Sequence, residues 1–232
     1  MHVTAIIVAA GAGRRIGGAT AKTYLPLAGR PLILRTLDRI FATPAIANVV
    51  LVVRATDVKD CRTLLDSDAS LKGCACVLQA GGATRQQSVR RGLKKLGPET
   101  DIVMIHDGAR PFVSSALVDR CLQAAVLKGA AVAGLPVRDT IKRVSGDGYI
   151  QSTPERTGLW EIQTPQIFQR DLIVAAHESA AREGFEASDD AMVVERIGKP
   201  VFVVEGERSN FKITVSEDLE LAEAMIRAGL VA

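Results

Sequence analysis

The loop that follows the first apolar run of the sequence combines flexible and positively charged residues. The run VTAIIVAA leads into GAGRRIGGATAK, in which Arg14, Arg15 and Lys22 follow Gly11 and Gly13. Glycine conformations at a strand end can point several backbone N–H groups at one anion, and arginine and lysine add charge-assisted donors. This combination predicts a phosphate-binding loop. The alternative is a tight turn whose basic side chains are solvated.

Neither of the two common nucleotide-binding motifs fits this loop. The dinucleotide fingerprint G-x-G-x-x-G, begun at Gly11 and Gly13, requires glycine where Ile16 stands. The pattern G-x-x-x-x-G-K-[ST] occurs nowhere in the sequence. An NAD-binding oxidoreductase is therefore disfavoured, and a missing absorbance change with nicotinamide cofactors would exclude it.

Continuous apolar runs predict the strands that must position this loop. They cover residues 3–10, 48–53, 74–80, 101–107 and 130–137. Such runs are typical of parallel strands that are covered on both faces. Because helix-like segments such as 31–41 and 84–96 alternate with them, we expect an α/β fold with an open, mostly parallel sheet and helices on both faces. Ligands of such sheets bind at the carboxyl ends of the strands.

Asp107 stands where the fourth of these runs ends. At the carboxyl end of a strand, a carboxylate could bind a substrate hydroxyl, help to hold a metal ion, or cap the next turn. The residue types leave these three interpretations open.

Residues 138–161 break the alternation of strands and helices. The segments TIKRV and YIQST flank the turn signal SGDG, which predicts a β-hairpin. A two-stranded ribbon is marginal alone, so the apolar Ile141, Val144 and Ile150 need a partner surface. Trp160 is expected to pack in the core or on the hairpin. Helices are also expected over 170–183, 188–197 and 216–228, and a strand over 201–206. Ser188 or Asp189 is expected to cap the helix over 188–197.

Composition limits the class of protein. A chain of 232 residues with 47% hydrophobic content can bury one large core, so we expect a single domain over residues 1–232. A net charge of +3 and 4% aromatic residues argue against a nucleic-acid-binding module. The four cysteines and three histidines form no zinc pattern or disulfide framework. No apolar stretch reaches the roughly 18 residues of a membrane helix, and we expect a cytoplasmic protein without a membrane partner.

Seven blocks of the sequence, in order, resemble one enzyme family. GAGRRIGGATAKTYLPLAGRPL resembles the signature loop of sugar-phosphate nucleotidylyltransferases, which have a Rossmann-like fold. The blocks that follow are GGATRQQSVRRGL, HDGARPFV, PVRDTIKRV, ERTGLWEIQTPQIF, SDDAMVVE and NFKITVSEDLELAE. Together they are similar to 2-C-methyl-D-erythritol 4-phosphate cytidylyltransferases over nearly the whole chain.

The resemblance implies a reaction between CTP and 2-C-methyl-D-erythritol 4-phosphate. A phosphate oxygen of the second substrate attacks the α-phosphorus of CTP, and pyrophosphate leaves. Because the nucleophile is already an anion, the catalytic problem is to stabilise charge. By resemblance, Arg15 and Lys22 stabilise the transition state, and Arg156 and Lys212 position the second substrate. A Mg²⁺ ion held largely by the CTP phosphates shares the charge, and the chain's own residues are assigned no metal site.

The same resemblance assigns two sets of binding residues. The pocket for the second substrate is lined by Asp107, Arg110, Thr140 and Thr164. The CTP pocket is formed by Val8, Ala9, Ala10, Gly11, Ala12, Gly13, Gly81, Gly82, Ser88 and Gly108. Without the resemblance, the segment from Gly81 to Ser88 is a turn followed by a helix cap at Thr84, and Lys212 is an outward lysine on a strand.

The hairpin is expected to take part in assembly. In this family the arm hooks around a twofold-related subunit, which implies a homodimer through residues 138–161 and a pocket shared between subunits. The alternative is an arm folded back on its own domain. Within the enzyme class, the nearest rival function is a cytidylyltransferase for another polyol phosphate, such as ribitol 5-phosphate, because loop and mechanism would be shared.

Overall fold

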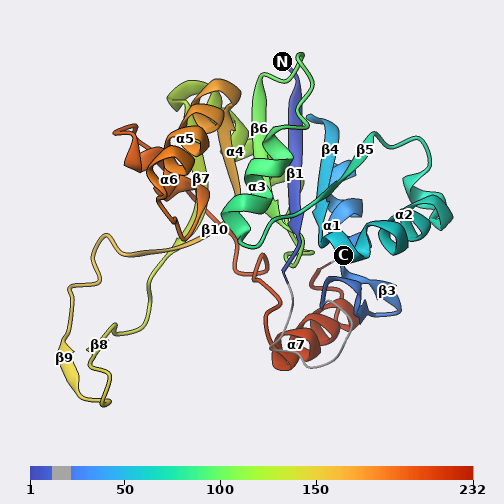
Figure 1. The fold of residues 1–232 in the computed structure, drawn as a ribbon. Helices are drawn as coiled ribbons and strands as arrows, with labels where there is room; N and C mark the ends of the chain where they lie inside the picture. The colour runs from blue at the N-terminus through green and yellow to red at the C-terminus, as the bar shows by residue number, and fades with distance from the viewer. Residues whose placement is uncertain (12–21, 232) are drawn as a thin grey trace.

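A seven-stranded sheet forms the centre of the molecule (Figure 1). The computed structural model describes residues 1–11 and 22–231, except for the side chain of Lys22. The strand order is β11-β7-β10-β6-β1-β4-β5. These strands are β1 (Val3–Ala9), β4 (Ile46–Val53), β5 (Cys76–Ala80), β6 (Ile102–Asp107), β7 (Ala130–Pro136), β10 (Trp160–Gln169) and β11 (Phe202–Glu205).

The sheet is parallel except for β10, which pairs antiparallel with both β6 and β7. The five predicted apolar runs are strands, and 201–206 contains β11. The sequence reading did not single out β10, because its centre QTPQ is polar. The register against β7 shifts between Ile162 and Gln166, around Pro165, which has no N–H to donate to a ladder. This interruption leaves Gln163 and Thr164 buried and available for side-chain contacts.

Helices cover both faces of the sheet, as predicted. One core cluster joins the sheet to α1 (Leu32–Phe41), α2 (Val58–Ser67) and α4 (Ser115–Lys128). A second cluster on the other face joins it to α3 (Arg85–Leu93), α5 (Arg170–Glu183) and α6 (Asp190–Arg196). Continuous apolar strands alternate their side chains between these two clusters, so both faces are dry. The caps agree with the sequence: Thr84 and Asp189 accept from the backbone N–H groups of Gln87 and Met192.

The last helix lies beyond the carboxyl ends of the strands. Helix α7 (Ser216–Arg227) contributes Ala222 to a third apolar cluster, which also holds Leu27 of β2 (Pro26–Leu27) and Leu32 beside β3 (Arg30–Pro31). Ile213 and Phe112 belong to the same cluster. Figure 1 shows α7 at the end of the molecule opposite the N-terminus. The cluster therefore fixes the segment before α7 against the end of the sheet.

The predicted hairpin extends away from the body of the molecule (Figure 1). Strands β8 (Arg143–Val144) and β9 (Ile150–Ser152) pair antiparallel in a sheet of their own. Ile141, Val144 and Ile150 are exposed, so the described residues of one chain do not supply the partner surface that the sequence predicts for them. Trp160, expected in the core or on the hairpin, is 39% exposed at the base of the arm. The arm therefore does not fold back on its own domain.

Candidate active site

The carboxyl ends of β1, β4 and β6 meet at one edge of the sheet and bring the predicted nucleotide residues together. The N–H of Gly108 donates to the carbonyl of Val8 at 2.9 Å, and the N–H of Gly81 donates to the carbonyl of Val53 at 2.7 Å. A Cβ at Gly81 would lie 2.5 Å from the Cβ of Ala10. Such a contact is impossible, so glycine is what allows the loop after β5 to touch the end of β1.

Ser88 fixes the loop that begins at Gly81. Its side chain is buried, and its hydroxyl accepts from the N–H of Gly82 at 3.1 Å and donates to the carbonyl of Thr84 at 2.9 Å. Arg91 of the same helix donates to the carbonyl of Gly81. The helix therefore holds the backbone of the glycine loop close to the strand ends. A planar ligand could approach this backbone because the glycines carry no side chain.

Asp107 lies between two cations at the end of β6. Its Oδ2 is 2.6 Å from Nζ of Lys212, and its Oδ1 is 3.2 Å from Nε of Arg85. Burial alone would raise the pKa of Asp107, but Arg85 and Lys212 hold that pKa well below its ordinary value. Asp107 is therefore ionised at neutral pH, and Lys212 sits on it from the side of the solvent.

Lys212 reaches Asp107 because its neighbours anchor the segment before α7. Asn210 is fully buried and donates to the carbonyl of Thr164 at 2.8 Å. The N–H of Ile213 donates to the carbonyl of Ala109 at 2.9 Å, and Phe211 packs against Phe112 with ring centroids 5.7 Å apart. This segment is not a strand, in contrast to the expectation for Lys212.

His106, Thr164 and Arg110 form a buried network beside Asp107. The Thr164 hydroxyl accepts from the N–H of Asp107 at 3.0 Å and lies 3.1 Å from Nδ1 of His106. His106 Nε2 is 3.1 Å from the carbonyl of Arg110. Burial lowers the pKa of His106 to about 4, so the ring is neutral at pH 7. The network is consistent with an Nε2–H that donates to Arg110 and an Nδ1 that accepts from Thr164.

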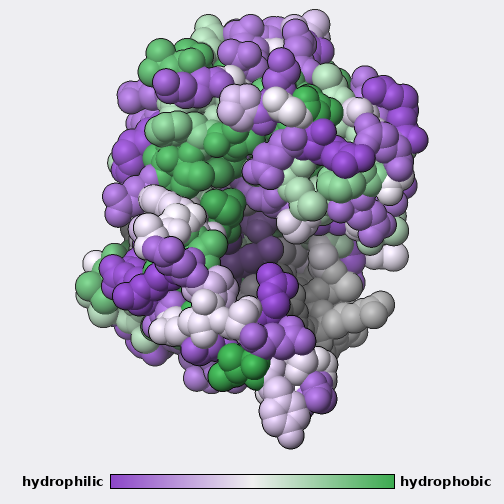
Figure 2. Space-filling model, turned by 90° about the vertical axis from the view of Figure 1, so that its left-hand side faces the viewer, coloured by the Kyte–Doolittle hydropathy of each residue, from purple (hydrophilic) through white to green (hydrophobic). Residues whose placement is uncertain are grey.

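A cavity of about 300 Å³ opens beside these residues. It is lined by Arg110, Leu135, Glu161, Ile162, Gln163, Arg208, Phe211 and Lys212. Arg110 donates through Nη1 to the carbonyl of Asn210 at 2.7 Å, while its buried Nε has no hydrogen-bond partner among the described residues. Figure 2 shows the side of the molecule with the arm, where the surface is hollowed and the hollow is hydrophilic. Three cations and a free buried donor suit an anionic ligand.

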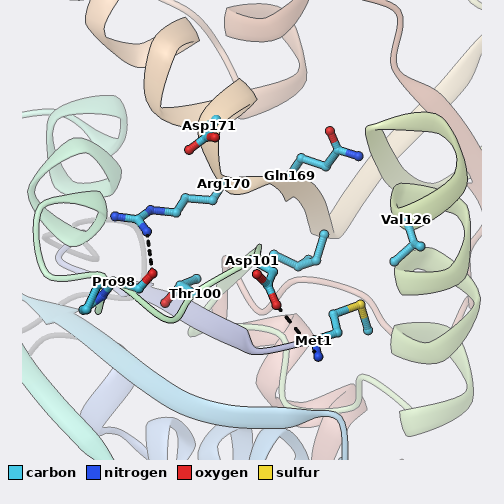
Figure 3. Close-up of a pocket in the computed structure, with 9 residues that line it drawn as sticks. Met1, Pro98, Thr100, Asp101, Val126, Gln169, Arg170 and Asp171 are labelled. Atoms are coloured by element: carbon cyan, nitrogen blue, oxygen red, sulfur yellow. Dashed lines mark hydrogen bonds and ion pairs between the residues drawn. The ribbon is translucent and has the colours of Figure 1, made fainter.

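A larger cavity of about 490 Å³ lies at the opposite, amino-terminal edge of the sheet (Figure 3). Two of its charged groups have partners within the chain: Asp101 faces the N-terminal amine of Met1 at 3.8 Å, and Arg170 donates to the carbonyl of Pro98 at 3.0 Å. Ligands of open α/β sheets bind at the carboxyl edge, so the smaller cavity is the better candidate.

The predicted site residues divide into four groups. Val8, Ala9, Ala10, Gly81, Gly82, Ser88 and Gly108 gather at the strand ends with Gly11, and Asp107, Arg110, Thr164 and Lys212 gather beside the cavity. Ala12, Gly13, Arg15 and the side chain of Lys22 lie outside the described residues. Thr140 and Arg156 belong to the arm, and Arg156 donates to the carbonyl of Arg138, two residues after the end of β7, at 2.6 Å.

Arg85 is a site residue that the sequence reading missed. Its partner Asp107 was a candidate, but nothing in the sequence places Arg85 beside it. One signal was available: Arg85 begins α3, where the helix dipole disfavours a cation, so helix formation alone does not explain it.

The described residues do not build a metal centre of their own. Across residues 1–11 and 22–231, no group of three or more His, Cys, Asp or Glu side chains could hold a metal ion. Asp107, the candidate ligand, has both oxygens engaged by cations. In this structure Asp107 is thus paired with cations of the chain itself.

The parallel sheet, the glycine loop at its carboxyl edge and the cationic cavity define an α/β enzyme for anionic small molecules. The family model described as 2-C-methyl-D-erythritol 4-phosphate cytidylyltransferase matches residues 3–228. The chain belongs to this family and is a nucleotidyltransferase.

Relatives agree with this membership. The chain is 42% identical over 226 residues to a 2-C-methyl-D-erythritol 4-phosphate cytidylyltransferase of Pelotomaculum thermopropionicum, a match that covers 97% of this chain and 94% of the relative. It is also 42% identical over 233 residues to the enzyme of that name from Geobacter metallireducens, covering 99% of this chain and 100% of the relative.

Solved structures share the fold. The structure of 2-C-methyl-D-erythritol 4-phosphate cytidylyltransferase from Thermus thermophilus has a TM-score of 0.80 at 40% identity and covers 98% of this chain and 100% of that one. The structure of 4-diphosphocytidyl-2C-methyl-D-erythritol synthase from Anaerococcus prevotii has a TM-score of 0.84 at 33% identity, with coverage of 97% and 98%. The expected Rossmann-like nucleotidyltransferase fold is confirmed.

Proposed function

We propose that this chain transfers the CMP group of CTP to 2-C-methyl-D-erythritol 4-phosphate. A phosphate oxygen of the acceptor bonds to the α-phosphorus of CTP, the bond to the β-phosphate oxygen breaks, and pyrophosphate leaves. The products are 4-diphosphocytidyl-2-C-methyl-D-erythritol and pyrophosphate. Family membership supports this step of the non-mevalonate isoprenoid pathway.

The arrangement of Lys212, Asp107 and Arg110 at the carboxyl edge carries the proposal. Lys212 and Arg110 line the cavity of about 300 Å³, and the unpartnered Nε of Arg110 is a donor that a phosphate oxygen would satisfy. The glycine loop at Gly81 belongs to the same sheet edge. A nucleotide on the loop and an acceptor phosphate in the cavity would therefore be neighbours, which supplies proximity for an in-line attack.

The residue roles combine the charge of the reaction with the family resemblance. We assign Lys212 to binding of the acceptor phosphate, and Asp107 and Thr164 to contacts with its polyol. We assign Arg15 and Lys22 to stabilisation of the charge that develops on the α-phosphate. Gly81, Gly82 and Ser88 form the base pocket together with the backbone from Val8 to Gly13 and Gly108.

The proposed reaction requires no general base. The acceptor oxygen already carries negative charge, and His106, whose pKa is lowered to about 4 by burial, is enclosed by Thr164 and Arg110. A neutral, fully engaged imidazole serves to hold the Thr164 hydroxyl and the end of β6 in place.

A divalent cation would come with the nucleotide. Since the described residues offer no metal centre, we propose that Mg²⁺ is held largely by the CTP phosphates and contributes positive charge there. The residues of the chain then orient the two anions and supply the remaining charge.

The arm suggests a homodimer built from single-domain chains. We propose that residues 138–161 pack on a second copy, because exposed apolar side chains at the tip and base of the arm have no cover in one chain. Thr140 and Arg156 would then reach the neighbour's cavity. We propose a reducing, cytoplasmic location because all four cysteines are free. None of the helices in the described part has the length and hydropathy to span a bilayer.

One assay tests the reaction. Purified protein is incubated with Mg²⁺, each of the four nucleoside triphosphates and a panel of polyol phosphates, and pyrophosphate release is measured. We expect CTP with 2-C-methyl-D-erythritol 4-phosphate to dominate. Equal or faster turnover with ribitol 5-phosphate would assign the chain to that acceptor instead.

A further inference from the structure

Five side chains from five segments form a continuous series of contacts from the cavity into the core. Lys212 is 2.6 Å from Asp107, Asp107 is 3.2 Å from Arg85, Arg85 is 2.7 Å from Asp190, and Asp190 is 3.0 Å from His177. The charge alternates in sign along the first four. The proposed reaction uses Lys212 and Asp107 and leaves Arg85 without a role.

Arg85 connects the two carboxylates through different nitrogens of one guanidinium. Nε donates to Oδ1 of Asp107, and Nη1 donates to Oδ2 of Asp190. The guanidinium is planar and rigid, so these bonds fix the position of Asp107 relative to Asp190. Burial by itself lowers the pKa of Arg85, but Asp190 and Asp107 raise it overall, and the side chain stays charged.

The far side of this connection is rigid. Asp190 is 1% exposed, and its backbone N–H donates to Oε1 of Gln166 in β10 at 3.0 Å. Its Oδ1 contacts Nε2 of His177, which is equally buried. Asp190 therefore acts as a fixed point from which Arg85 holds Asp107 at the edge of the sheet.

The charge balance links Arg85 to Lys212. An Asp107 without Arg85 would direct its whole negative charge at Lys212 and hold that ammonium more strongly. Because Arg85 also pairs with the Asp107 carboxylate, less of the positive charge of Lys212 is neutralised, and Lys212 attracts an anion in the cavity more strongly. Removal of Arg85 should therefore weaken phosphate binding at Lys212 even though Arg85 does not line the cavity.

We infer that Arg85 is a positioning residue for the acceptor side of the reaction: it clamps Asp107 against Asp190 and so presents the Lys212 ammonium to the acceptor phosphate. The identity of that phosphate rests on the proposed function, whereas the effect on Lys212 does not. Arg85 begins α3, directly after the glycine loop, so a general disturbance of the helix would instead impair CTP binding.

A double-mutant cycle separates these effects. Arg85→Gln should raise KM for the polyol phosphate by about tenfold or more and change KM for CTP by less than about threefold, the scale of coupling between contacting charges. In a Lys212→Ala background the same change should add little. Arg90→Gln, on the exposed face of the same helix, is the matched control and should behave as wild type. Equal losses in both backgrounds would overturn the inference.

A second variant guards against a folding defect. Arg85→Gln removes a cation from the buried Asp190 carboxylate, which by itself is destabilising. The double variant Arg85→Gln with Asp190→Asn removes that unmatched charge. It should fold and still show the raised KM for the polyol phosphate; a return to the wild-type KM would mean that Arg85 acts through stability alone, and the inference would be wrong.

A measurement without turnover keeps the inference separate from the proposed reaction. NMR of isotope-labelled lysine side chains, with the Lys212 signal assigned through Lys212→Arg, is recorded during titration with inorganic phosphate. Arg85→Gln should move the Lys212 signal and weaken its response to phosphate, while Arg90→Gln should not. A Lys212 signal indifferent to Arg85 would refute the inference, whereas a wild-type protein that fails to release pyrophosphate would refute only the proposed reaction.

Discussion

Positive charge at the carboxyl edge of the sheet is supplied by individual residues with different tasks. Lys212 and Arg110 line a cavity, and Arg85 pairs with the carboxylate of Asp107. Arg15 and Lys22 belong to the signature loop after β1. Charges that are fixed before the substrate arrives need no reorganisation during the reaction, which is why single substitutions should have large effects.

The first residue-scale prediction concerns the signature loop. Lys22→Ala and Arg15→Ala should each lower kcat by about a hundredfold or more, the scale for removing a preorganised donor from a transition state. Arg14→Ala is the matched control, because we expect Arg14 to be an outer charge and its loss to change kcat little. Pyrophosphate release under saturating substrates measures all three. Near-normal kcat for Lys22→Ala and Arg15→Ala would remove their proposed role.

A second residue-scale prediction follows from the buried His106. Its pKa is about 4 in the folded protein against an ordinary value of 6.5, because burial disfavours the charged ring. The unfolded chain therefore binds a proton that the folded one does not between these values, and stability falls as pH drops through that window. The loss should approach about 3 kcal/mol by pH 4.

Urea unfolding across this pH range provides the measurement. The variant His106→Gln lacks the titrating ring and should show a flatter dependence between pH 6.5 and 4, and His2→Gln, at an exposed position, serves as the matched control. Asp107 and Asp190 have lowered pKa values and weaken the fold only at still lower pH. Parallel curves for wild type and His106→Gln would contradict this assignment.

The sequence predicted individual site residues unevenly. The position of Asp107 was predicted from physical pattern, because a carboxylate after an apolar run lies at the ligand edge of a parallel sheet, whereas its place in the acceptor pocket was assigned through family resemblance. Lys212 was assigned only through family resemblance, since its position depends on Asn210 and Ile213, whose partners Thr164 and Ala109 lie far away in the sequence. The sequence could not assign a role to Arg85, because its two carboxylate partners, Asp107 and Asp190, come together only in the folded chain.

At the scale of elements, continuous apolar runs were sufficient to place the parallel strands, and caps placed α3 and α6. The central strand β10 was missed because a polar segment with a proline interrupts its pattern. That same polarity makes the site: Gln163 and Thr164 are buried there and bind Asn210. A strand whose centre serves side-chain contacts loses the hydrophobic signal by which strands are recognised.

An element-scale prediction tests the contact between the loop after β5 and the end of β1. In Gly81→Ala the new methyl group would lie 2.5 Å from the Cβ of Ala10, so the loop must move away from the strand end. Overpacking of this kind costs about 1–3 kcal/mol, and we expect KM for CTP to rise by roughly tenfold. Gly146→Ala in the hairpin turn, where a Cβ would meet nothing within 4 Å, is the control. An unchanged KM for CTP would show that this contact is not part of the nucleotide site.

At the scale of the whole molecule, the arm is the feature that one chain leaves unexplained. It extends from the body with Val144, Tyr149 and Ile150 exposed near its tip and Trp160 and Ile162 exposed at its base (Figure 1). Thr140 and Arg156, assigned to the acceptor pocket by resemblance, are on this arm, and neither is among the residues that line the cavity beside Lys212 in the same chain. A closed dimer in which each arm lies on the other body would cover the apolar side chains and complete both pockets.

Complementation between two inactive variants tests this arrangement. If the arm of one subunit serves the other subunit's pocket, a mixed dimer of Lys22→Ala and Arg156→Ala contains one intact site, assembled from the unmodified loop of one chain and the unmodified arm of its partner. After subunit exchange, half of the dimers are mixed, so activity should recover to roughly a quarter of the wild-type value. The control mixture of Lys22→Ala with Arg15→Ala has both defects in the loop and should stay inactive, because no mixed dimer then holds an intact site. Light scattering measures the mass and mixing of differently tagged chains demonstrates the exchange. A monomeric mass, or no recovery after demonstrated exchange, would show that each chain completes its own site.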